Sequence, residues 1–310
     1  MKIVIIRKAS HKTQRLIAGQ FPADLNLVFV TAKDLPKEIE DADVLIPENE
    51  IIPVPILSHA KTLKLIQTGA GYDNVPLEEC TQRGIYVANA PGINAQAVAE
   101  HVFTFILCWY KNIIPLNAVM RAGDNTPNYR GAELSDRTLG VIGFGHIGKE
   151  VARLARAFNM QVLGYHYRPV KADDEVEIVD WQTLLVSSDI LTVHVALNRQ
   201  TRHMIGTKEF EAMKPDALLI NTSRGAVIDE SALLDALKNE IIGGAGLDVF
   251  EVEPLPADSP FRKLNNVILT PHMAGEPDGL YFHVKRFKFF NENIQRVAQG
   301  KVPKYALNKF

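Results

Sequence analysis

Short apolar runs alternate with polar, helix-compatible segments along most of the chain. A first series comprises Lys2–Ile6, Leu27–Val30, Val44–Ile46, Leu63–Gln67 and Tyr86–Ala88, separated by segments such as Lys33–Asp41 and Leu77–Arg83. A second series comprises Leu139–Ile142, Gln161–Tyr165, Ile190–His194, Ala217–Asn221, Ala245–Val249 and Val267–Leu269. Such alternation predicts an α/β fold with two doubly wound domains, each built on a parallel sheet covered by helices.

Two further stretches have a helical pattern. Glu100–Met120 lies between the two series and predicts one long buried helix, followed by the polar segment Arg121–Arg130. Near the C-terminus an apolar stripe recurs at steps of three and four residues, at Phe287, Phe290, Ile294 and Val297. We expect this helix to pack back on the first domain. The basic residues near its start are expected to form a solvated face: Lys285, Arg286 and Lys288.

A glycine-rich segment follows the first apolar run of the second series. Gly143, Gly145 and Gly148 form the spacing G-x-G-x-x-G between a predicted strand and a predicted helix. The first glycine permits a tight turn, the second lets the backbone approach a pyrophosphate, and the third lets helix and strand pack closely. With the amides of His146 and Ile147 at the helix start, the segment predicts a dinucleotide site. Glycines at this spacing also occur in ordinary turns and in methyltransferases.

The end of the next predicted strand bears on which dinucleotide binds. An acidic residue that holds the adenosine ribose is expected there, but the chain reads His166-Tyr167-Arg168-Pro169. An arginine and a histidine suit the 2′-phosphate of NADP, and the missing acid removes a repulsion. We therefore favour NADP(H) over NAD(H). The alternative is that Arg168 is a solvated loop residue.

Several motifs in the same order resemble the D-isomer-specific 2-hydroxyacid dehydrogenase family over essentially the full length. They are the glycine-rich turn, Thr68–Asn74, Asn89–Glu100, Ile220–Gly225, Gly246–Pro254 and Leu269–Gly275. The resemblance implies a flavodoxin-like substrate domain, residues 1–98 and 284–310, and a Rossmann dinucleotide-binding domain, residues 99–283. It also implies hydride transfer between NAD(P)H and a small 2-oxo acid or D-2-hydroxy acid.

The resemblance assigns catalytic roles to three residues that each follow a predicted strand. Arg224 matches the arginine that binds the substrate carboxylate and polarises the carbonyl. His272 matches the general acid and base, and Glu253 matches the carboxylate that orients the imidazole and favours its protonated form. Alone, each residue also fits an ordinary role, as a surface cation, a packed imidazole or a loop acid. Their joint occurrence favours catalysis.

Further contacts follow from the same resemblance. Thr222, Ser223, Asp248, Ala274 and Gly275 are expected beside the nicotinamide. The backbone amides of Gly69, Ala70 and Gly71 are expected to take the substrate carboxylate, and no metal is expected. We assign His101, His194 and His203 structural roles, and His194 is expected to border the adenosine.

Two departures from the usual family pattern bear on the cofactor and the substrate. His194-Val195-Ala196-Leu197 stands where many members have His-x-Pro-Leu, which loosens a backbone restraint near the cofactor. Glu276 follows Gly275, and an acid near the substrate would disfavour a phosphorylated substrate by like-charge repulsion, unless a partner cation neutralises it. The substrate remains open among glyoxylate, hydroxypyruvate, phosphohydroxypyruvate and longer 2-oxo acids.

The composition of the chain limits which binding partners are expected. The 310 residues carry 34 Lys and Arg against 36 Asp and Glu, so the net charge of −2 gives no field for binding nucleic acid. The two cysteines, Cys80 and Cys108, fit neither a disulfide framework nor a zinc site, and a cytoplasmic location without membrane insertion is expected. The resemblance implies a homodimer. The apolar helix that carries Phe103, Phe105, Ile106 and Trp109, with Arg121–Arg130, is the expected contact surface, and packing within one chain is the alternative for these side chains. A dimeric scaffold or co-repressor without turnover is the alternative function.

Overall fold

The chain folds into two units, each built around one parallel sheet. The structure, a computed structural model, describes residues 1–124, 130–166, 176–275 and 280–310. The first unit comprises Met1–Asn94 and Asp278–Phe310, and the second comprises Ala95–Pro277. These limits lie a few residues from the predicted ones, because the helix that begins at Ala95 packs in the core of the second unit. The roles assigned to the two domains stay predictions here.

The first unit has a five-stranded sheet in the order β2-β1-β3-β4-β5, with every neighbouring pair parallel. This is the order of a flavodoxin-like doubly wound sheet. Each of the five predicted runs forms a strand, with limits shifted by no more than two residues. The strands are β1 (Lys2–Ile6), β2 (Asn26–Val30), β3 (Val44–Ile46), β4 (Leu65–Gln67) and β5 (Tyr86–Ala88).

Helices cover both faces of this sheet, because alternate side chains of each strand point to opposite sides. In β1, Val4 lies in the cluster that receives α2, η1 and α3, whereas Ile3 and Ile5 lie in the cluster that receives α1 and α10. The helices are α1 (His11–Ala18), α2 (Leu35–Glu38), the 3₁₀ helix η1 (Val54–Ser58), α3 (Leu77–Gln82) and α10 (Leu280–Ala298).

The predicted apolar stripe of α10 is buried among the strands of the first unit. The expectation that Arg286 lies on a solvated face is wrong. Its Nη2 lies 2.5 and 2.7 Å from the two carboxylate oxygens of Glu48, and its guanidinium lies 4.8 Å from the centre of the Phe287 ring. A buried guanidinium is stable when a carboxylate pairs with it in this way. Lys285 and Lys288 are exposed as predicted.

The second unit has a seven-stranded parallel sheet in the order β12-β11-β10-β9-β6-β7-β8. Counted from β6, this is the Rossmann order extended by one strand. The strands are β6 (Thr138–Ile142), β7 (Gln161–Tyr165), β8 (Glu177–Ile178), β9 (Ile190–Val193), β10 (Leu218–Asn221), β11 (Gly244–Leu247) and β12 (Val267–Leu269). The predicted fold class is thus confirmed in both units. Among the strands that the described residues form, only the two-residue strand β8 is not predicted from the sequence.

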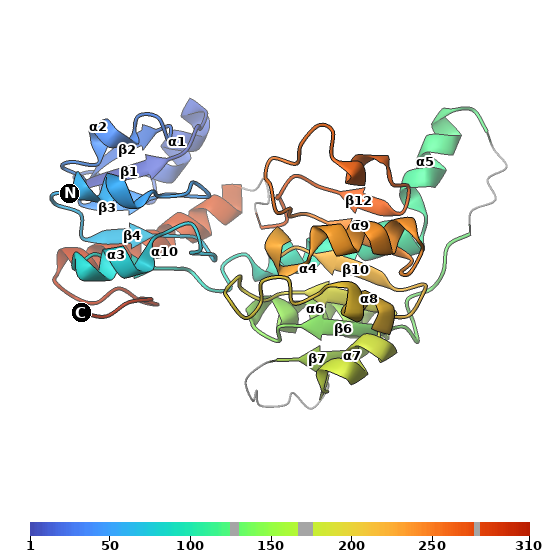
Figure 1. Cartoon of the computed structure of the whole chain (residues 1–310). Coiled ribbons are helices and arrows are strands. Elements are labelled where there is room, and N and C mark those ends of the chain that lie inside the picture. The colour runs from blue at the N-terminus through green and yellow to red at the C-terminus, as the bar shows by residue number, and fades with distance from the viewer. Residues whose placement is uncertain (125–129, 167–175, 276–279) are drawn as a thin grey trace. The chain divides into compact units, whose positions relative to one another are not determined.

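Two apolar clusters lie on the two faces of this sheet. One includes residues of α4 and α6, and the other includes residues of α7, α8 and α9 (Figure 1). The helices are α4 (Ala95–Tyr110), α5 (Ile113–Arg121), α6 (His146–Ala157), α7 (Trp181–Ser187), α8 (Thr207–Ala212) and α9 (Glu230–Lys238). The described residues of this unit also form the short 3₁₀ helices η2 (Gly225–Val227) and η3 (Pro260–Lys263).

The predicted helix Glu100–Met120 is in fact two helices. Asn112 has a φ of 51° and separates α4 from α5, because asparagine tolerates the left-handed conformation that breaks a helix. Three side chains assigned to a dimer contact lie in the core instead: Phe103, Phe105 and Ile106 are at most 4% exposed. That part of the dimer prediction is wrong. Arg121–Arg130 includes residues outside the described ones.

Among the described helices, none alone is long and apolar enough to cross a membrane. The pair α4 and α5 passes the same test of length and composition when joined, but the two helices bend by 59° at their break. Half of the residues of α4 are buried in the second unit, as in the core helix of a globular domain.

Candidate active site

Six strands of the second unit end at the same edge of the sheet. The register pairs Ile142 with Tyr165 and Val193, and pairs Asn221 with Val193 and Leu247. Because all neighbours are parallel, the residues that follow these strands share one edge. They are Gly143, His166, His194, Thr222, Asp248 and Thr270.

The glycine-rich turn joins β6 to α6 and requires two of its three glycines for steric reasons. Gly143 has a φ of 92°, and a Cβ there would lie 2.5 Å from the carbonyl oxygen of His194. A Cβ on Gly148 would lie 2.4 Å from the carbonyl oxygen of Gly143. Gly145 differs, since a Cβ there would meet nothing within 4 Å. The space beside Gly145 is therefore open to a ligand that approaches the backbone.

The start of α6 supplies hydrogen-bond donors next to that space. Gly145 is the N-cap, so the N–H groups of His146, Ile147 and Gly148 lie in the first turn, where an α-helix offers no acceptor. The twelve-residue helix also directs the positive end of its dipole here. The arrangement can hold an anionic group such as a pyrophosphate.

The residues predicted to select the dinucleotide follow β7. His166 comes directly after the strand and is half-buried. Tyr167 and Arg168 lie outside the described residues, so their part in selecting NADP(H) stays a prediction.

Two buried polar atoms at this edge have no hydrogen-bond partner among the described residues. One is the hydroxyl of Thr222, and the other is Nδ1 of His194. The other ring nitrogen of His194 lies 2.9 Å from the hydroxyl of Thr192, and burial lowers the pKa of His194 to about 3. His194 is therefore a neutral imidazole. Unpaired buried polar atoms are costly and often mark the place of a ligand.

The loop after β10 is organised by Asn221, a residue that sequence reasoning did not single out. Its buried side-chain oxygen accepts hydrogen bonds from the N–H and hydroxyl of Ser223, at 3.0 and 2.8 Å. Its amide nitrogen donates to the carbonyl oxygen of Arg224. The loop therefore has a fixed backbone, and Nη1 of Arg224 donates to the carbonyl of Ser223 at 2.8 Å.

Gly225 lets the backbone of this loop pack closely against the segment that carries Glu253. A Cβ on Gly225 would lie 1.9 Å from the carbonyl carbon of Phe250 and 2.3 Å from the nitrogen of Glu251. Only glycine allows so close an approach of two backbones. The Arg224 loop and the Phe250–Glu253 turn consequently form one rigid arrangement.

His272 and Glu253 form a direct pair. Nδ1 of His272 lies 2.6 Å from one carboxylate oxygen of Glu253, and the other oxygen accepts a hydrogen bond from the N–H of Phe250 at 3.0 Å. The hydrogen bond to Glu253 raises the pKa of His272, against the opposing effects of burial and of the Arg224 charge. Burial opposes ionisation of Glu253, but its hydrogen bonds with His272 and Phe250 hold its pKa below the ordinary value. The pair thus favours an imidazolium beside a carboxylate.

The backbone at His272 is held in an unusual conformation. Its φ is 52°, in the left-handed region that a residue with a Cβ rarely adopts. Asp248 stabilises this conformation, because its carbonyl accepts a hydrogen bond from the N–H of His272 at 2.7 Å. Its fully buried carboxylate accepts from the N–H groups of Met273 and Ala274, at 2.9 and 2.8 Å. Strain maintained in this way is common at functional sites.

These bonds bear on the cofactor contacts predicted for Asp248, Ala274 and Gly275. The carboxylate of Asp248 already accepts hydrogen bonds from protein groups at both oxygens, including the hydroxyl of Thr270 at 2.6 Å. Ala274 is buried and Gly275 is half-buried. Their contacts with a nicotinamide remain predictions, as does the effect of Glu276, which lies outside the described residues.

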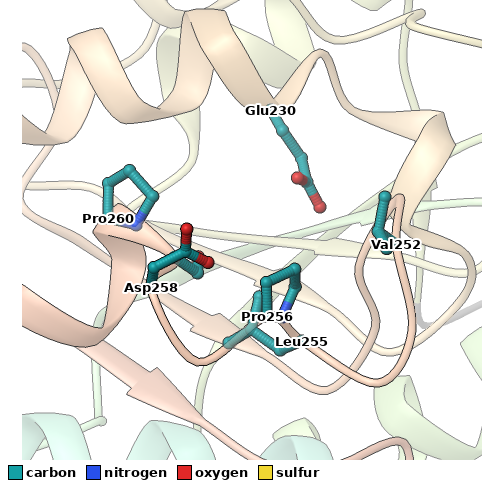
Figure 2. A pocket seen from close by; sticks show the side chains of 7 residues that line it. Glu230, Val252, Leu255, Pro256, Asp258 and Pro260 are labelled. Carbon is teal, nitrogen blue, oxygen red and sulfur yellow. The ribbon is translucent and has the colours of Figure 1, made fainter.

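A pocket of about 250 Å³ lies beside the turn that carries Glu253. Figure 2 shows Glu230 directed from the start of α9 towards the loop that carries Val252, Leu255 and Pro256. A carboxylate oxygen of Glu230 accepts a hydrogen bond from the N–H of Glu251 at 2.6 Å. Burial raises the pKa of Glu230. The pocket includes none of the three predicted catalytic side chains, so we regard Glu230 as a support of the turn.

The predicted carboxylate loop belongs to the first unit and follows β4. The N–H groups of Gly69, Ala70 and Gly71 donate no hydrogen bond within the described part of the chain. The loop is anchored on its acceptor side, because the carbonyl of Gly69 accepts from Ala90 N–H and that of Ala70 accepts from the side chain of Asn89. Three adjacent free amides are a suitable site for an anion.

Known families and proteins are similar to this chain over most of its length. The family model described as "D-isomer specific 2-hydroxyacid dehydrogenase, NAD binding domain" matches residues 103–274, more than half of the chain. The chain therefore belongs to the D-isomer-specific 2-hydroxyacid dehydrogenase family, whose members are NAD(P)-linked oxidoreductases.

Individual relatives agree with this assignment. The glyoxylate reductase of Thermococcus litoralis is 40% identical over 289 residues, which cover 88% of this chain and 86% of that protein. The D-3-phosphoglycerate dehydrogenase of Archaeoglobus fulgidus is 35% identical, and the match covers 90% of this chain but only 54% of that protein.

Solved structures share the fold of both units. The structure titled "Acyclic imino acid reductase (Bsp5) in complex with NADPH and D-Arg" is 30% identical, with a TM-score of 0.87 over 99% of this chain and 100% of that chain. A formate dehydrogenase from Staphylococcus aureus, in complex with NAD, is 26% identical, with a TM-score of 0.88 over 100% of this chain and 99% of that chain.

Proposed function

We propose that the protein transfers a hydride between NAD(P)H and a small 2-oxo acid, giving a D-2-hydroxy acid, with His272 as general acid. The observation that carries the proposal is the 2.6 Å contact between His272 and Glu253, at a sheet edge that also holds Arg224 and the glycine-rich turn. The proposed substrate is of the glyoxylate, hydroxypyruvate or phosphohydroxypyruvate type. The likeness to a glyoxylate reductase supports a small 2-oxo acid.

The residues present fit a dinucleotide. The open space at Gly145, the N–H groups at the start of α6 and the unpaired hydroxyl of Thr222 are three independent features that suit phosphate and polar ligand groups. Gly143 to Gly148 would hold the pyrophosphate, and Thr222 and Ser223 would lie beside the nicotinamide. When bound, the reduced cofactor supplies the hydride.

The protein's own groups supply the remaining chemistry. Nδ1 of His272 is engaged with Glu253, so the proton for the new alkoxide leaves from Nε2. Glu253 stays ionised and stabilises the imidazolium before transfer. Arg224 binds the substrate carboxylate through its planar guanidinium and polarises the carbonyl that receives the hydride. In the reverse direction, neutral His272 accepts the proton of the hydroxyl group.

We further propose that the amides of Gly69, Ala70 and Gly71 bind the substrate carboxylate. The proposal rests on the family resemblance and on the free N–H groups of this loop. Replacing Ala70 with proline removes one of these donors and is expected to raise the KM for the 2-oxo acid more than the KM for the cofactor. Equal effects on both would contradict the assignment.

A preference for NADP(H) over NAD(H) is a separate proposal, supported by the residues after β7 in the sequence. Replacing Arg168 with alanine is expected to raise the KM for NADPH by about tenfold or more while leaving the KM for NADH nearly unchanged. Steady-state kinetics with both cofactors measures this. If both values rise together, Arg168 does not select the 2′-phosphate.

The proposed reaction is tested by following NADPH and NADH oxidation with a panel of 2-oxo acids. Purified protein is first shown to bind a dinucleotide by fluorescence titration, and turnover is then measured for the wild type and for His272→Ala. The variant is expected to lose most of its kcat while its dinucleotide affinity stays close to the wild-type value. Dinucleotide binding without turnover of any 2-oxo acid would favour the scaffold alternative.

A homodimer is also proposed from the family resemblance. The exposed apolar side chains of α5, rather than the buried ones of α4, are available for such a contact: Ile113, Ile114 and Met120 are each about half exposed. Size-exclusion chromatography with light scattering measures the mass in solution. A monomer at the protein concentrations used for kinetics would contradict the proposal.

A further inference from the structure

Helix α4 and strand β11 pack against each other with a matched spacing. A Cβ on Gly244 would lie 2.2 Å from the Trp109 ring, and a Cβ on Gly246 would lie 2.8 Å from the Phe105 ring. The two aromatic residues are four positions apart in the helix, and the two glycines are two positions apart in the strand. Four helical residues rise about 6.0 Å and two strand residues about 6.6 Å, so the two spacings agree.

The same spacing, continued by four residues in the helix and two in the strand, pairs His101 with Asp248. His101 lies four positions before Phe105, and Asp248 lies two positions after Gly246. Nε2 of His101 lies 3.8 Å from a carboxylate oxygen of Asp248 and 3.0 Å from the hydroxyl of Thr270. The His101 ring also meets the Phe105 ring edge to face, at 4.7 Å between centres. His101 is thus held by packing, with one nitrogen at the end of the sheet.

The hydrogen-bond pattern assigns the proton on His101. The hydroxyl of Thr270 donates to Asp248 at 2.6 Å, so it has no proton left for the imidazole. Nε2 of His101 must therefore carry the proton and donate to Thr270. Burial lowers the pKa of His101, which agrees with a neutral ring that has this single donor. The chain of donors runs from His101 to Thr270 to Asp248.

Asp248 in turn holds the backbone around His272 by hydrogen bonds. Its carbonyl and its carboxylate together accept the N–H groups of three consecutive residues, at 2.7, 2.9 and 2.8 Å. The first of these is His272, whose φ of 52° requires outside support. One oxygen of Asp248 accepts from both Thr270 and Met273, so rotation of the carboxylate would break bonds on both sides.

We propose that His101 is a positioning residue: through Thr270 and Asp248 it fixes the backbone that presents His272 to Glu253. The inference rests on the proposed function, since it concerns the same general acid. His101 itself need not touch the substrate or the cofactor. Its donor nitrogen sets the orientation of a buried carboxylate, and that carboxylate sets the orientation of the general acid.

The test compares three variants with the wild type. His101→Phe keeps a ring beside Phe105 but removes the donor, and is expected to lower kcat by about tenfold. It is also expected to move the falling limb of the pH–rate profile for reduction to lower pH, because a looser contact with Glu253 raises the pKa of His272 less. His101→Gln restores an N–H donor near the same place and is expected to recover most of both effects.

Trp109→Phe is the matched control, taken at the Gly244 contact, two steps of the spacing away from His101. It is expected to lower the melting temperature through lost packing, but to leave the pH–rate profile in place. The proposal is overturned if His101→Phe keeps the wild-type kcat and profile, or if His101→Gln does not recover what His101→Phe loses. If the wild type itself shows no turnover, the proposed function fails instead. The readout is then the His272 pKa from an NMR titration of the imidazole signals, which the proposal expects to fall in His101→Phe.

Discussion

Gly225→Ala is the most direct test of how the site is held together. The new Cβ would lie 1.9 Å from the carbonyl carbon of Phe250, whereas ordinary contacts begin near 3.4 Å. The two backbones must therefore separate by about 1.5 Å. Glu253 reaches His272 through a single 2.6 Å contact and is anchored to Phe250 N–H, so the displacement separates the pair.

The size of the effect follows from that displacement. A misplacement of about 1 Å in a catalytic arrangement costs on the order of 100-fold in rate, or about 2.7 kcal/mol in the activation free energy. We expect kcat for 2-oxo acid reduction to fall by about this factor. The dissociation constant of the dinucleotide is expected to change less than kcat. Thr222 and Ser223 share the loop of Gly225, but the glycine-rich turn follows β6, which β9 separates from β10 in the sheet.

Two other glycine variants complete the experiment. Gly206→Ala adds a methyl group at the N-cap of α8, where the nearest atom is the side chain of Glu209 at 3.8 Å, and should leave kinetics unchanged. Gly145→Ala adds one in the open space beside the helix start, and should raise the KM for the dinucleotide. Circular dichroism and thermal melting show whether each variant folds. A folded Gly225→Ala with wild-type kcat would refute the reasoning that this contact positions Glu253.

Two further predictions concern ionisation and the buried hydroxyl. Reduction requires protonated His272, whose pKa is raised, so kcat/KM for reduction should fall as pH rises through that pKa; Glu253→Gln removes the main cause of the raised pKa and should move the fall to lower pH. A pH–rate profile unchanged in Glu253→Gln would show that the pair does not control the acid. Thr222→Val removes an unpaired buried hydroxyl and should raise the free energy of unfolding of the cofactor-free protein by about 1 kcal/mol, while weakening dinucleotide binding. Chemical denaturation and fluorescence titration measure the two effects, and unchanged affinity would remove Thr222 from the cofactor site.

Much of the fold was predictable because its signals are local. Buried parallel strands are short, apolar and regularly spaced, and the two sheets reproduce the predicted runs. The errors occurred where a distant partner decides the structure. Arg286 reads as a solvated cation in its own helix, but its partner Glu48 is 238 positions away. Likewise, the apolar pattern continues across Asn112, and only its backbone conformation ends the helix.

The residues of the candidate site also divide into those that a local motif predicts and those whose role depends on distant contacts. Arg224, Glu253 and His272 stand in segments whose order alone marks them, and the glycine spacing marks the start of α6. The residues that hold these groups in place have no such sequence motif. His101 looked like an ordinary packed histidine, because its contact with Thr270 depends on how α4 lies against β11. A periodic pattern shows which face of a helix is buried, but it does not give the register of that face on its strand.

The discontinuity of the first unit has a consequence for the order in which the protein folds during synthesis. The β1 face that holds Ile3 and Ile5 is completed by Phe287, Phe290 and other residues of α10. The 183 residues of the second unit are translated in between, which takes roughly 10–40 s at about 5–20 residues per second. The second unit, a single stretch of chain, has all its residues before α10 exists. The first unit, whose strands are made first, is thus the last to complete its core. The sheet face that holds Ile3 and Ile5 lacks its covering helix until α10 has been translated.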